Sequence, residues 1–194
     1  MNQIKIKSRY KLYTVTKENW KDFEKLFGKK GACAGCWCMY WRISSSQWKK
    51  QQGSGNKRAI KKLIFSDITP GILAYDNEQP IGWCSVAPRE EFFRLESSRI
   101  LKPVDDKPVW SVVCFFIDKT YRKRGVSVEL LNAAKKYVKS KHGKIIEGYP
   151  VEPKEGKYPD TFAYTGLAKA FTRAGFKEVI RRSETRSVMR LYLK

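Results

Sequence analysis

The spacing of apolar residues divides the first third of the chain into short strands and helices. The predicted elements are a strand over residues 10–16, a helix from Thr16 to Phe27, a loop over residues 31–40, and two short polar helices around residues 47–51 and over residues 56–65. Thr16 is a suitable N-cap for the first helix, and Gly28 ends it. The loop is crowded with cysteine and tryptophan, so this region is unlike an ordinary polar connection.

The rest of the chain reads as strands that alternate with two longer helices. The predicted elements are a hairpin of residues 71–75 and 81–87, a strand over 109–117, a helix from Gly125 to Ser140, a strand over 144–151, a helix over 162–174, and closing strands over 178–182 and 188–193. The first of these helices places Val126, Leu130 and Ala134 on one face. A strand–helix–strand order requires a crossover connection. The pattern therefore predicts an α+β fold with at least one parallel strand pair.

Length and composition fit one folded domain. The 194 residues contain no internal repeat or long linker, and 42% hydrophobic with 13% aromatic residues are enough for a buried core. The longest apolar run, residues 112–117, has the length of a strand, so we expect no membrane span. The odd count of five cysteines and the lack of a secretory signal favour a reducing, cytoplasmic setting.

The chain is strongly basic, with 40 Lys and Arg residues against 19 Asp and Glu residues and a formal net charge of +21. Such a charge favours anionic partners, such as nucleic acid, phosphorylated cofactors or acidic surfaces. The basic residues are spread along the whole sequence, which equally fits a surface solvated by lysine. Charge by itself therefore indicates an anion without naming one.

The sharpest chemical feature is a basic turn between a buried strand and a long helix. The strand ends near Ile117, Arg122, Lys123 and Arg124 follow, and Gly125 opens the helix. The first N–H groups of a helix lack intrahelical acceptors, and the positive end of the helix dipole lies there. A glycine lets a phosphate approach the backbone closely. The turn therefore predicts an anion site, although it lacks the glycine patterns of Walker A loops and dinucleotide-binding folds.

Three stretches of the sequence together resemble the GNAT superfamily of N-acetyltransferases. They are the coenzyme A turn Arg122-x-x-Gly125-x-Ser127, the segment from Ala170 to Phe176 with its aromatic residue ahead of Gly-Phe, and Ile81-Gly82-Trp83 in the predicted hairpin. The resemblance covers roughly the C-terminal two-thirds of the chain in the family's order. It implies an α+β fold with a mixed, mostly antiparallel twisted sheet, flanking helices and a splayed pair of coenzyme-binding strands.

The resemblance also implies how the chain is organised and what it binds. A single GNAT-like domain would span residues 1–194, with acceptor-side helices and the aromatic loop in residues 1–66 and the sheet and coenzyme-binding core in residues 67–194. The activity would be transfer of an acetyl group from acetyl-CoA to a primary amine, without a metal. The implied coenzyme-binding residues are Phe115, Phe116 and Ile117 along the pantetheine arm, and Arg122, Lys123, Arg124, Gly125, Val126, Ser127 and Val128 around the pyrophosphate. For Phe115 to Ile117 the alternative is a core strand, and the two roles are compatible.

The catalytic residues of the family are not at their usual places. Phe171 stands where relatives often carry a tyrosine that protonates the leaving thiolate, and Ser111 stands where some carry a glutamate base. Tyr164 is a candidate acid or coenzyme contact because a helix over 162–174 would put it on the same face as Phe171, with packing as the alternative. Glu147 is a candidate base, with a salt bridge or a surface position as the alternative. Asp118, at the end of the strand that contains Phe115 to Ile117, is a further candidate. Proton removal through water, with catalysis mostly by positioning, stays open.

The loop over residues 31–40 contains Cys33-x-x-Cys36-x-Cys38, which invites comparison with metal sites. Zinc requires a fourth ligand, and no second Cys-x-x-Cys accompanies it, so we expect thiols without a metal. Cys84 and Cys114 fall in predicted strands, where cysteine acts as a small hydrophobic residue. The neighbouring rings Trp37, Tyr40, Trp41 and Trp48 resemble an acceptor lid, and the alternative is that they cover the edge of the sheet.

Two other functions fit the same observations. A module that binds acyl-CoA without turnover would explain the missing tyrosine and glutamate. A basic nucleic-acid-binding protein would explain the net charge of +21. The acceptor is not specified by the sequence and could be a small molecule or a peptide, and the oligomeric state stays open, with a homodimer as one option.

Overall fold

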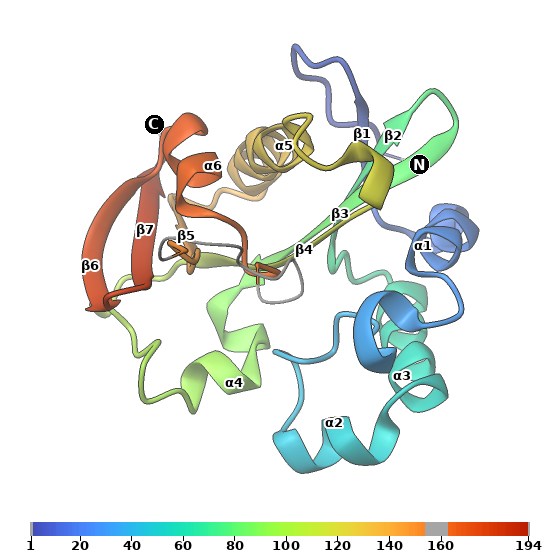
Figure 1. Ribbon diagram of the computed structural model, residues 1–194, viewed down its shortest axis with the longest axis horizontal. Helices are drawn as coiled ribbons and strands as arrows, with labels where there is room; N and C mark the ends of the chain where they lie inside the picture. Colours follow the sequence, from blue (N-terminus) through green and yellow to red (C-terminus); the bar gives the residue numbers. More distant parts are fainter. Residues whose placement is uncertain (1, 154–162, 194) are drawn as a thin grey trace.

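A seven-stranded sheet with the order β1-β2-β3-β4-β5-β7-β6 forms the centre of the computed structural model (Figure 1), which describes residues 2–153 and 163–193. The strands are β1 (Lys11–Thr14), β2 (Gly71–Asp76), β3 (Gln79–Pro88), β4 (Trp110–Ile117), β5 (Ile145–Gly148), β6 (Lys177–Ser183) and β7 (Arg186–Tyr192). All neighbouring strands are antiparallel except β4 and β5, which are parallel. The expectation of a mixed, mostly antiparallel sheet with flanking helices is confirmed.

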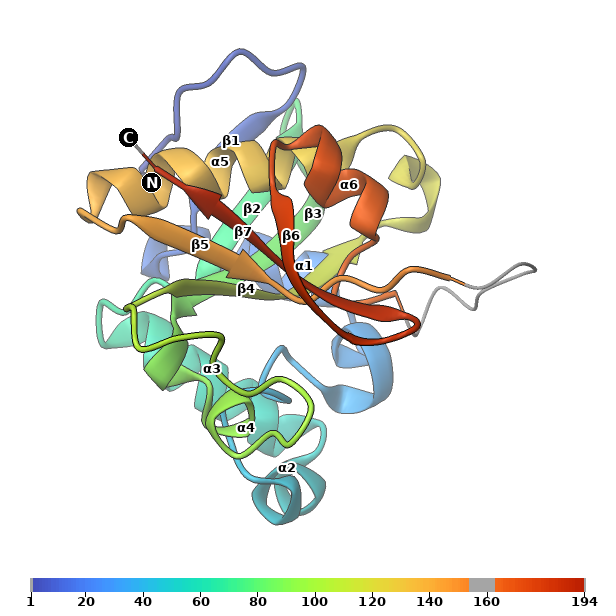
Figure 2. The same cartoon turned by 90° about the vertical axis from the view of Figure 1, so that its left-hand side faces the viewer.

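The helices cover both faces of this sheet. They are α1 (Trp20–Phe27), α2 (Ser45–Gln51), α3 (Ser54–Phe65), α4 (Phe93–Glu96), α5 (Val126–Ser140) and α6 (Ala168–Arg173). Figures 1 and 2 show α5 and α6 on one face and α2, α3 and α4 gathered on the other, where α1 also packs. The crossover that the parallel pair requires is α5, which connects β4 to β5 across the first face.

Each face of the sheet has its own apolar core. Under α5 and α6, the buried residues include Leu130, Ala134 and Phe171. Under α1 and α3, they include Phe23, Ile60 and Trp83. Burial of a large apolar side chain stabilises a fold by about 1.5–3 kcal/mol, so two cores of this size fix the sheet between two helical layers.

One predicted helix is shorter than its pattern. The helix expected over residues 162–174 begins only at Ala168, and residue 162 lies outside the described residues. Gly166 has φ +90°, in the left-handed region, and Leu167 is extended, so the backbone enters α6 from a turn. Tyr164 lies in that turn, and the prediction that it shares a helical face with Phe171 is wrong.

Within the described ranges, no helix is both long and apolar enough to cross a membrane.

Candidate active site

The parallel strands β4 and β5 lie side by side for a short distance and then separate. Their pairing covers Trp110, Ser111 and Val112 of β4, whereas β4 itself continues to Ile117. In the gap, the N–H of Phe115 donates a hydrogen bond to the carbonyl oxygen of Tyr164 over 2.6 Å. Because backbone groups alternate between the two edges of a strand, Ile117 shares this edge with Phe115. The gap therefore presents the backbone of β4 to any ligand that enters from the side of β5.

Aromatic packing closes the gap on the face of α6. The ring of Phe171 lies so close to Gly148 and Gly166 that a Cβ atom at either glycine would overlap it. Phe171 also meets Phe115 edge to face, with ring centroids 6.0 Å apart. Phe171 is fully buried and has no proton to donate, so its role here is to form an apolar floor.

A β-bulge in β4 changes which side chains face the aromatic loop. Ser85 of β3 pairs with Cys114 and Val86 pairs with Val112, so Val113 is an extra residue in β4. Successive side chains normally alternate between faces, and a bulge interrupts this alternation. Val112 and Phe115 consequently pack on the α5 face, while both Val113 and Cys114 pack on the opposite face. The bulge thus turns the Cys114 thiol toward the aromatic loop.

The basic turn forms an open helix end next to this gap. Gly125 adopts φ +81° as the N-cap of α5, and no protein atom lies within 4 Å of the position that a Cβ would occupy. Lys123 also has a positive φ of 62°. At the start of the turn, hydrogen bonds from Thr120 and the nearby Arg122 hold the pKa of the Asp118 carboxyl below its usual range. Asp118 therefore acts as a cap for the turn that leads to α5.

The structure places the predicted coenzyme-binding residues along this path with different degrees of exposure. Phe115 and Val126 are buried, Phe116, Ile117, Arg122, Ser127 and Val128 are half-buried, and Lys123, Arg124 and Gly125 are exposed. Some of their backbone N–H groups are already engaged: that of Phe115 bonds to Tyr164, that of Arg122 to the carbonyl of Lys119 over 3.4 Å, and that of Val128 to the carbonyl of Gly125 over 2.9 Å. The helix end thus offers an anion the N–H groups that precede Val128.

Tyr164 lies beside the gap although it is not on α6. Its ring meets the Tyr40 ring edge to face at 6.0 Å. Burial raises the pKa of the Tyr164 phenol, and the nearby Tyr40 and Cys114 raise it further, against a lowering by Arg186. The phenol is therefore protonated at neutral pH, which is the state that a proton donor needs.

Glu147 lies in a buried ion-pair network. Its carboxylate accepts hydrogen bonds from Arg190 Nε at 2.6 Å, Arg89 Nη1 at 3.3 Å and the Tyr149 hydroxyl at 2.7 Å. The Tyr149 hydroxyl is also 2.8 Å from Ser111 Oγ, and Ser111 is the register partner of Glu147. Only 1% of Glu147 is exposed, so both carboxylate oxygens are committed to protein partners.

Sequence reasoning did not single out Arg89, Tyr149 or Arg190. Arg89 is 58 residues and Arg190 is 43 residues from Glu147 in the chain, so no local pattern joins them. Of these three residues, only Tyr149 could have been found from the sequence. It follows Glu147 by two residues, and strand alternation places both on one face.

The aromatic loop divides into a packed part and a part that faces the gap. Trp37 is 4% exposed, and its ring stacks on that of Phe27 with centroids 5.6 Å apart, so this ring belongs to the core under α1 and α3. Tyr40, Trp41 and Trp48 are half-buried, and the Tyr40 ring contacts both tryptophans and Tyr164. The guanidinium of Arg94 lies 3.8 Å from the Tyr40 ring centroid. One face of the Tyr40 ring thus already holds a cation of the protein.

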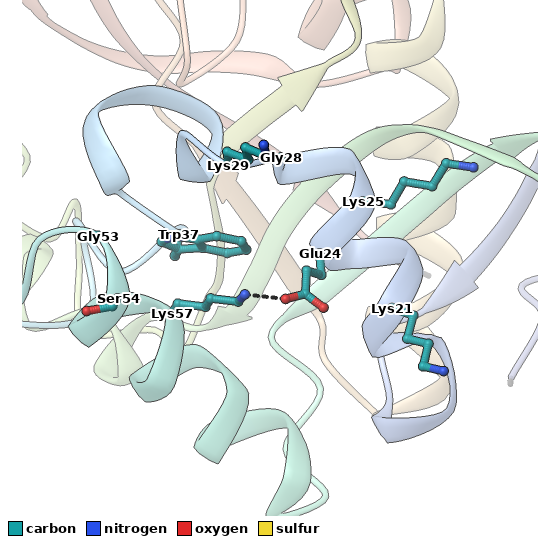
Figure 3. A pocket seen from close by; sticks show the side chains of 9 residues that line it. All are labelled: Lys21, Glu24, Lys25, Gly28, Lys29, Trp37, Gly53, Ser54 and Lys57. Atoms are coloured by element: carbon teal, nitrogen blue, oxygen red, sulfur yellow. Dashed lines mark ion pairs between the residues drawn. The ribbon is translucent and has the colours of Figure 1, made fainter.

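A separate pocket of about 660 Å³ lies between α1 and α3 (Figure 3). Its wall includes the four lysines Lys21, Lys25, Lys29 and Lys57. Lys57 forms an ion pair with Glu24, and its Nζ lies 5.2 Å from the Trp37 ring centroid. The pocket is therefore basic and lies behind the aromatic loop rather than at the gap between β4 and β5.

The cysteines contribute to two environments. Cys84 is fully buried in the α5 core, as its strand position predicted. Cys36, Cys38 and Cys114 lie on the opposite face, near one another and near Tyr164. In the described part of the chain, no group of three or more His, Cys, Asp or Glu side chains is arranged to hold a metal ion.

Comparison with known proteins identifies a family for this arrangement. Residues 34–149 match the family described as "Acetyltransferase (GNAT) family". No curated protein sequence matches the chain. The matched segment includes the aromatic loop, the basic turn and α5, so it spans both sides of the gap.

Solved structures share the fold at low sequence identity. A GNAT-family acetyltransferase from Listeria monocytogenes superposes with a TM-score of 0.57 at 10% identity, covering 99% of this chain and 100% of that one. An insect putative arylalkylamine N-acetyltransferase 7 from Aedes aegypti gives 0.56 at 14% identity, with coverages of 95% and 88%. The ribosomal-protein-S5-alanine acetyltransferase from Vibrio fischeri gives 0.53 at 12% identity, with coverages of 100% and 98%.

Proposed function

Because the chain belongs to the GNAT family of acetyltransferases, we propose that it transfers an acetyl group from acetyl-CoA to a primary amine. One observation carries this proposal: the open edge of β4 leads directly into a basic turn and the left-handed Gly125 at the start of α5. A pantetheine arm needs an extended backbone to pair with, and a pyrophosphate needs helix N–H groups and cations. The two needs are met in that order along one stretch of chain.

The basic turn at Gly125 suits a pyrophosphate both sterically and electrostatically. The empty space beside Gly125 lets an anion approach the backbone, and the dipole of the 15-residue α5 favours negative charge at this end. Lys123 and Arg124 are exposed next to it and add positive charge. Acetyl-CoA, when bound, supplies the thioester that is transferred.

The edge of β4 would orient the reacting carbonyl. A backbone N–H that points at the developing oxyanion stabilises the transition state of acyl transfer, and Ile117 and Phe115 are the groups on this edge. Since the Phe115 N–H bonds to Tyr164 in this structure, it can serve only if the Tyr164 carbonyl withdraws. The apolar floor around Phe171 keeps water from the thioester.

We assign the proton donor for the leaving thiolate to Tyr164. Its raised pKa keeps the phenol protonated, and its main chain already contacts the β4 edge at Phe115. Protonation of the thiolate by solvent is the alternative, which the substitution described in the Discussion distinguishes.

For Glu147, the geometry favours the salt-bridge alternative over the role of general base. A base must offer a lone pair to the substrate ammonium, and this carboxylate is engaged by Arg190, Arg89 and Tyr149. We propose that Glu147 holds these side chains in place beside Ser111 and that the amine loses its proton to water.

Release of the coenzyme thiol tests the proposal. The protein is mixed with acetyl-CoA and a panel of primary amines that includes arylalkylamines and an alanine-containing peptide, because the names of two structural neighbours mention an arylalkylamine and a ribosomal-protein-S5 alanine. We expect thiol release that depends on one class of amine. Coenzyme A binding in calorimetry without turnover on any amine would instead support a module that binds acyl-CoA only.

A further inference from the structure

Two cysteines from distant parts of the chain lie together on the acceptor side of the sheet. Cys38 belongs to the aromatic loop, and Cys114 belongs to β4, where the bulge turns it toward that loop. The Cys38 sulfur accepts a hydrogen bond from Trp83 Nε1 over 2.9 Å, and Cys38 packs in the same apolar cluster as Cys114, whose thiol interacts with it. Ser85, the register partner of Cys114, also reaches Cys38. Cys38 therefore lies over the point where β3 and β4 present Trp83, Ser85 and Cys114.

The backbone adopts an unusual conformation to place Cys38 there. Trp37 and Cys38 are consecutive non-glycine residues in the left-handed region, with φ of +47° and +59°. Residues of this kind rarely adopt this conformation, and the surrounding structure must hold them in it. The Trp37 ring, packed against Phe27, supplies this hold on one side, and the hydrogen bond from Trp83 supplies it on the other.

The surroundings favour a thiolate at Cys38 and a thiol at its neighbours. Burial acts to raise the pKa of Cys38, but the Cys114 thiol, the Trp83 N–H and the charge of Arg42 outweigh it, so the pKa lies below the usual value. The bond to Cys38 and burial raise the pKa of Cys114. Burial and the charge of Cys38 raise the pKa of Cys36 to about 11, and burial raises that of Cys84. Cys38 is thus the cysteine of this group whose pKa is lowered, while the pKa values of Cys36, Cys84 and Cys114 are raised.

We propose that Cys38 and Cys114 form a redox-reactive dithiol that hydrogen peroxide oxidises to a disulfide, tying the aromatic loop to β4. The Cys38 thiolate attacks a peroxide oxygen, so that an S–O bond forms, the O–O bond breaks and the leaving hydroxide takes a proton to become water. The Cys114 sulfur, after losing its proton, then attacks the sulfenic acid of Cys38. An S–S bond forms, and the departing oxygen leaves as a second water.

The position of the disulfide connects it to the proposed function. Cys114 directly precedes Phe115, whose N–H lies on the open edge of β4, and Tyr164 packs beside both. If the proposed acetyl transfer is correct, the disulfide would fix the acceptor side of the gap and lower the rate of transfer. The formation of the disulfide itself does not depend on that activity, so the two proposals fail separately.

The reactivity of Cys38 is tested first on the unaltered protein. Iodoacetamide alkylation is followed at each cysteine by peptide mass spectrometry over a series of pH values, with the exposed Cys33 as the internal reference. Cys38 is only 6% exposed, so its absolute rate reflects access, but the pH midpoint of its rate reports the thiolate. We expect the midpoint for Cys38 to lie below that for Cys33. Equal midpoints, or a higher one for Cys38, would overturn the proposal.

The disulfide is tested with hydrogen peroxide followed by peptide mapping without reductant. We expect a peptide pair that joins Cys38 to Cys114, lighter by two hydrogen atoms, which dithiothreitol reverses. Cys114→Ser should abolish the pair and leave Cys38 as a sulfenic acid that dimedone traps, whereas the matched control Cys33→Ser should form the pair as the unaltered chain does. A disulfide between Cys36 and either Cys33 or Cys38, or oxidation of Cys33 alone, would contradict the assignment.

Discussion

The side chains near the gap between β4 and β5 differ in the chemical roles that they can take. Tyr164 has a protonated phenol and a carbonyl bonded to the β4 edge, so it is suited to proton donation. Glu147 has a carboxylate occupied by two arginines and a tyrosine, so it is suited to hold other groups in place. Phe171, which stands at the family's usual tyrosine position, contributes only an apolar surface.

Replacement of Tyr164 by Phe tests the proton donor. The substitution removes one hydroxyl and keeps the ring against Tyr40, so packing changes little. A general acid contributes about 10²–10⁴-fold, and we expect kcat to fall at least a hundredfold with coenzyme affinity unchanged. Steady-state kinetics and calorimetry measure both, with Tyr40→Phe as the control. A loss of less than about tenfold, under ~1.4 kcal/mol in the barrier, would mean that Tyr164 is not the acid.

Replacement of Glu147 separates a holding role from a base role. Glu147→Ala leaves the buried Arg190 with Asp105 as its remaining carboxylate partner, and we expect urea unfolding to show a loss of about 3 kcal/mol, the low end of the range for a broken buried pair. Glu147→Gln keeps the volume and one acceptor oxygen, so its loss should be smaller.

The pH profile of kcat/KM for Glu147→Gln gives the second readout. If Glu147 only holds its neighbours, the acidic limb of the profile keeps its midpoint at a lower overall rate. Disappearance of that limb would identify Glu147 as the base after all.

At the scale of elements, the arrangement depends on where strands and helices end. β4 extends beyond its pairing with β5, the bulge at Val113 changes which face the β4 side chains occupy, and α5 begins at a left-handed glycine. Each is a departure from regular structure that exposes backbone or reorients a side chain. Together they place the β4 edge, the basic turn and the Cys114 thiol around one gap.

Substitution of Gly125 tests the start of α5 as the pyrophosphate site. Asp and Asn have the same shape and both tolerate the left-handed conformation at a cost on the order of 1 kcal/mol, so the pair differs by one charge. Gly125→Asp places a carboxylate beside the expected phosphates, and repulsion on the order of 1–4 kcal/mol should weaken coenzyme A binding tenfold or more. Calorimetry should show a much smaller loss for Gly125→Asn. Equal coenzyme A affinities of the two folded variants would show that the pyrophosphate does not bind at the start of α5.

At the scale of the whole molecule, the sheet separates the two proposed sites between its faces. α5 and α6 lie on the face with the basic turn (Figure 1), while the aromatic loop, Cys38 and Cys114, and the lysine-lined pocket (Figure 3) lie on the other. The net charge of +21 attracts anions in general. A general electrostatic attraction and a specific binding site predict different dependences of affinity on salt concentration.

Salt dependence tests the nucleic-acid alternative. We expect a labelled single-stranded RNA to bind weakly, with a steep negative slope of log affinity against log salt, and to be lost near physiological salt. Reversing charge at Lys25 and Lys29 in the pocket should reduce the affinity no more than reversing Lys136 and Lys139 on α5. Fluorescence anisotropy measures both. Tight binding that persists at high salt and depends on the pocket would support a nucleic-acid function.

The sequence by itself determined what local patterns encode. Apolar periodicity located the strands and most helices, because each element must bury one face against the sheet or the core. Gly125 and its basic neighbours marked the helix start, since glycine at a positive φ and the helix dipole are properties of a few consecutive residues. The family and the mixed sheet followed from the same short motifs.

Only the tertiary structure decided how distant residues meet. Arg89 and Arg190 reach Glu147 from other strands and loops, and Cys38 reaches Cys114 through a bulge that strand alternation did not predict. The turn at Gly166 overrode the helical pattern around Tyr164 and set its carbonyl against Phe115. Such contacts depend on strand register, bulges and chain reversals, which arise when the sheet assembles and which no short stretch of sequence specifies.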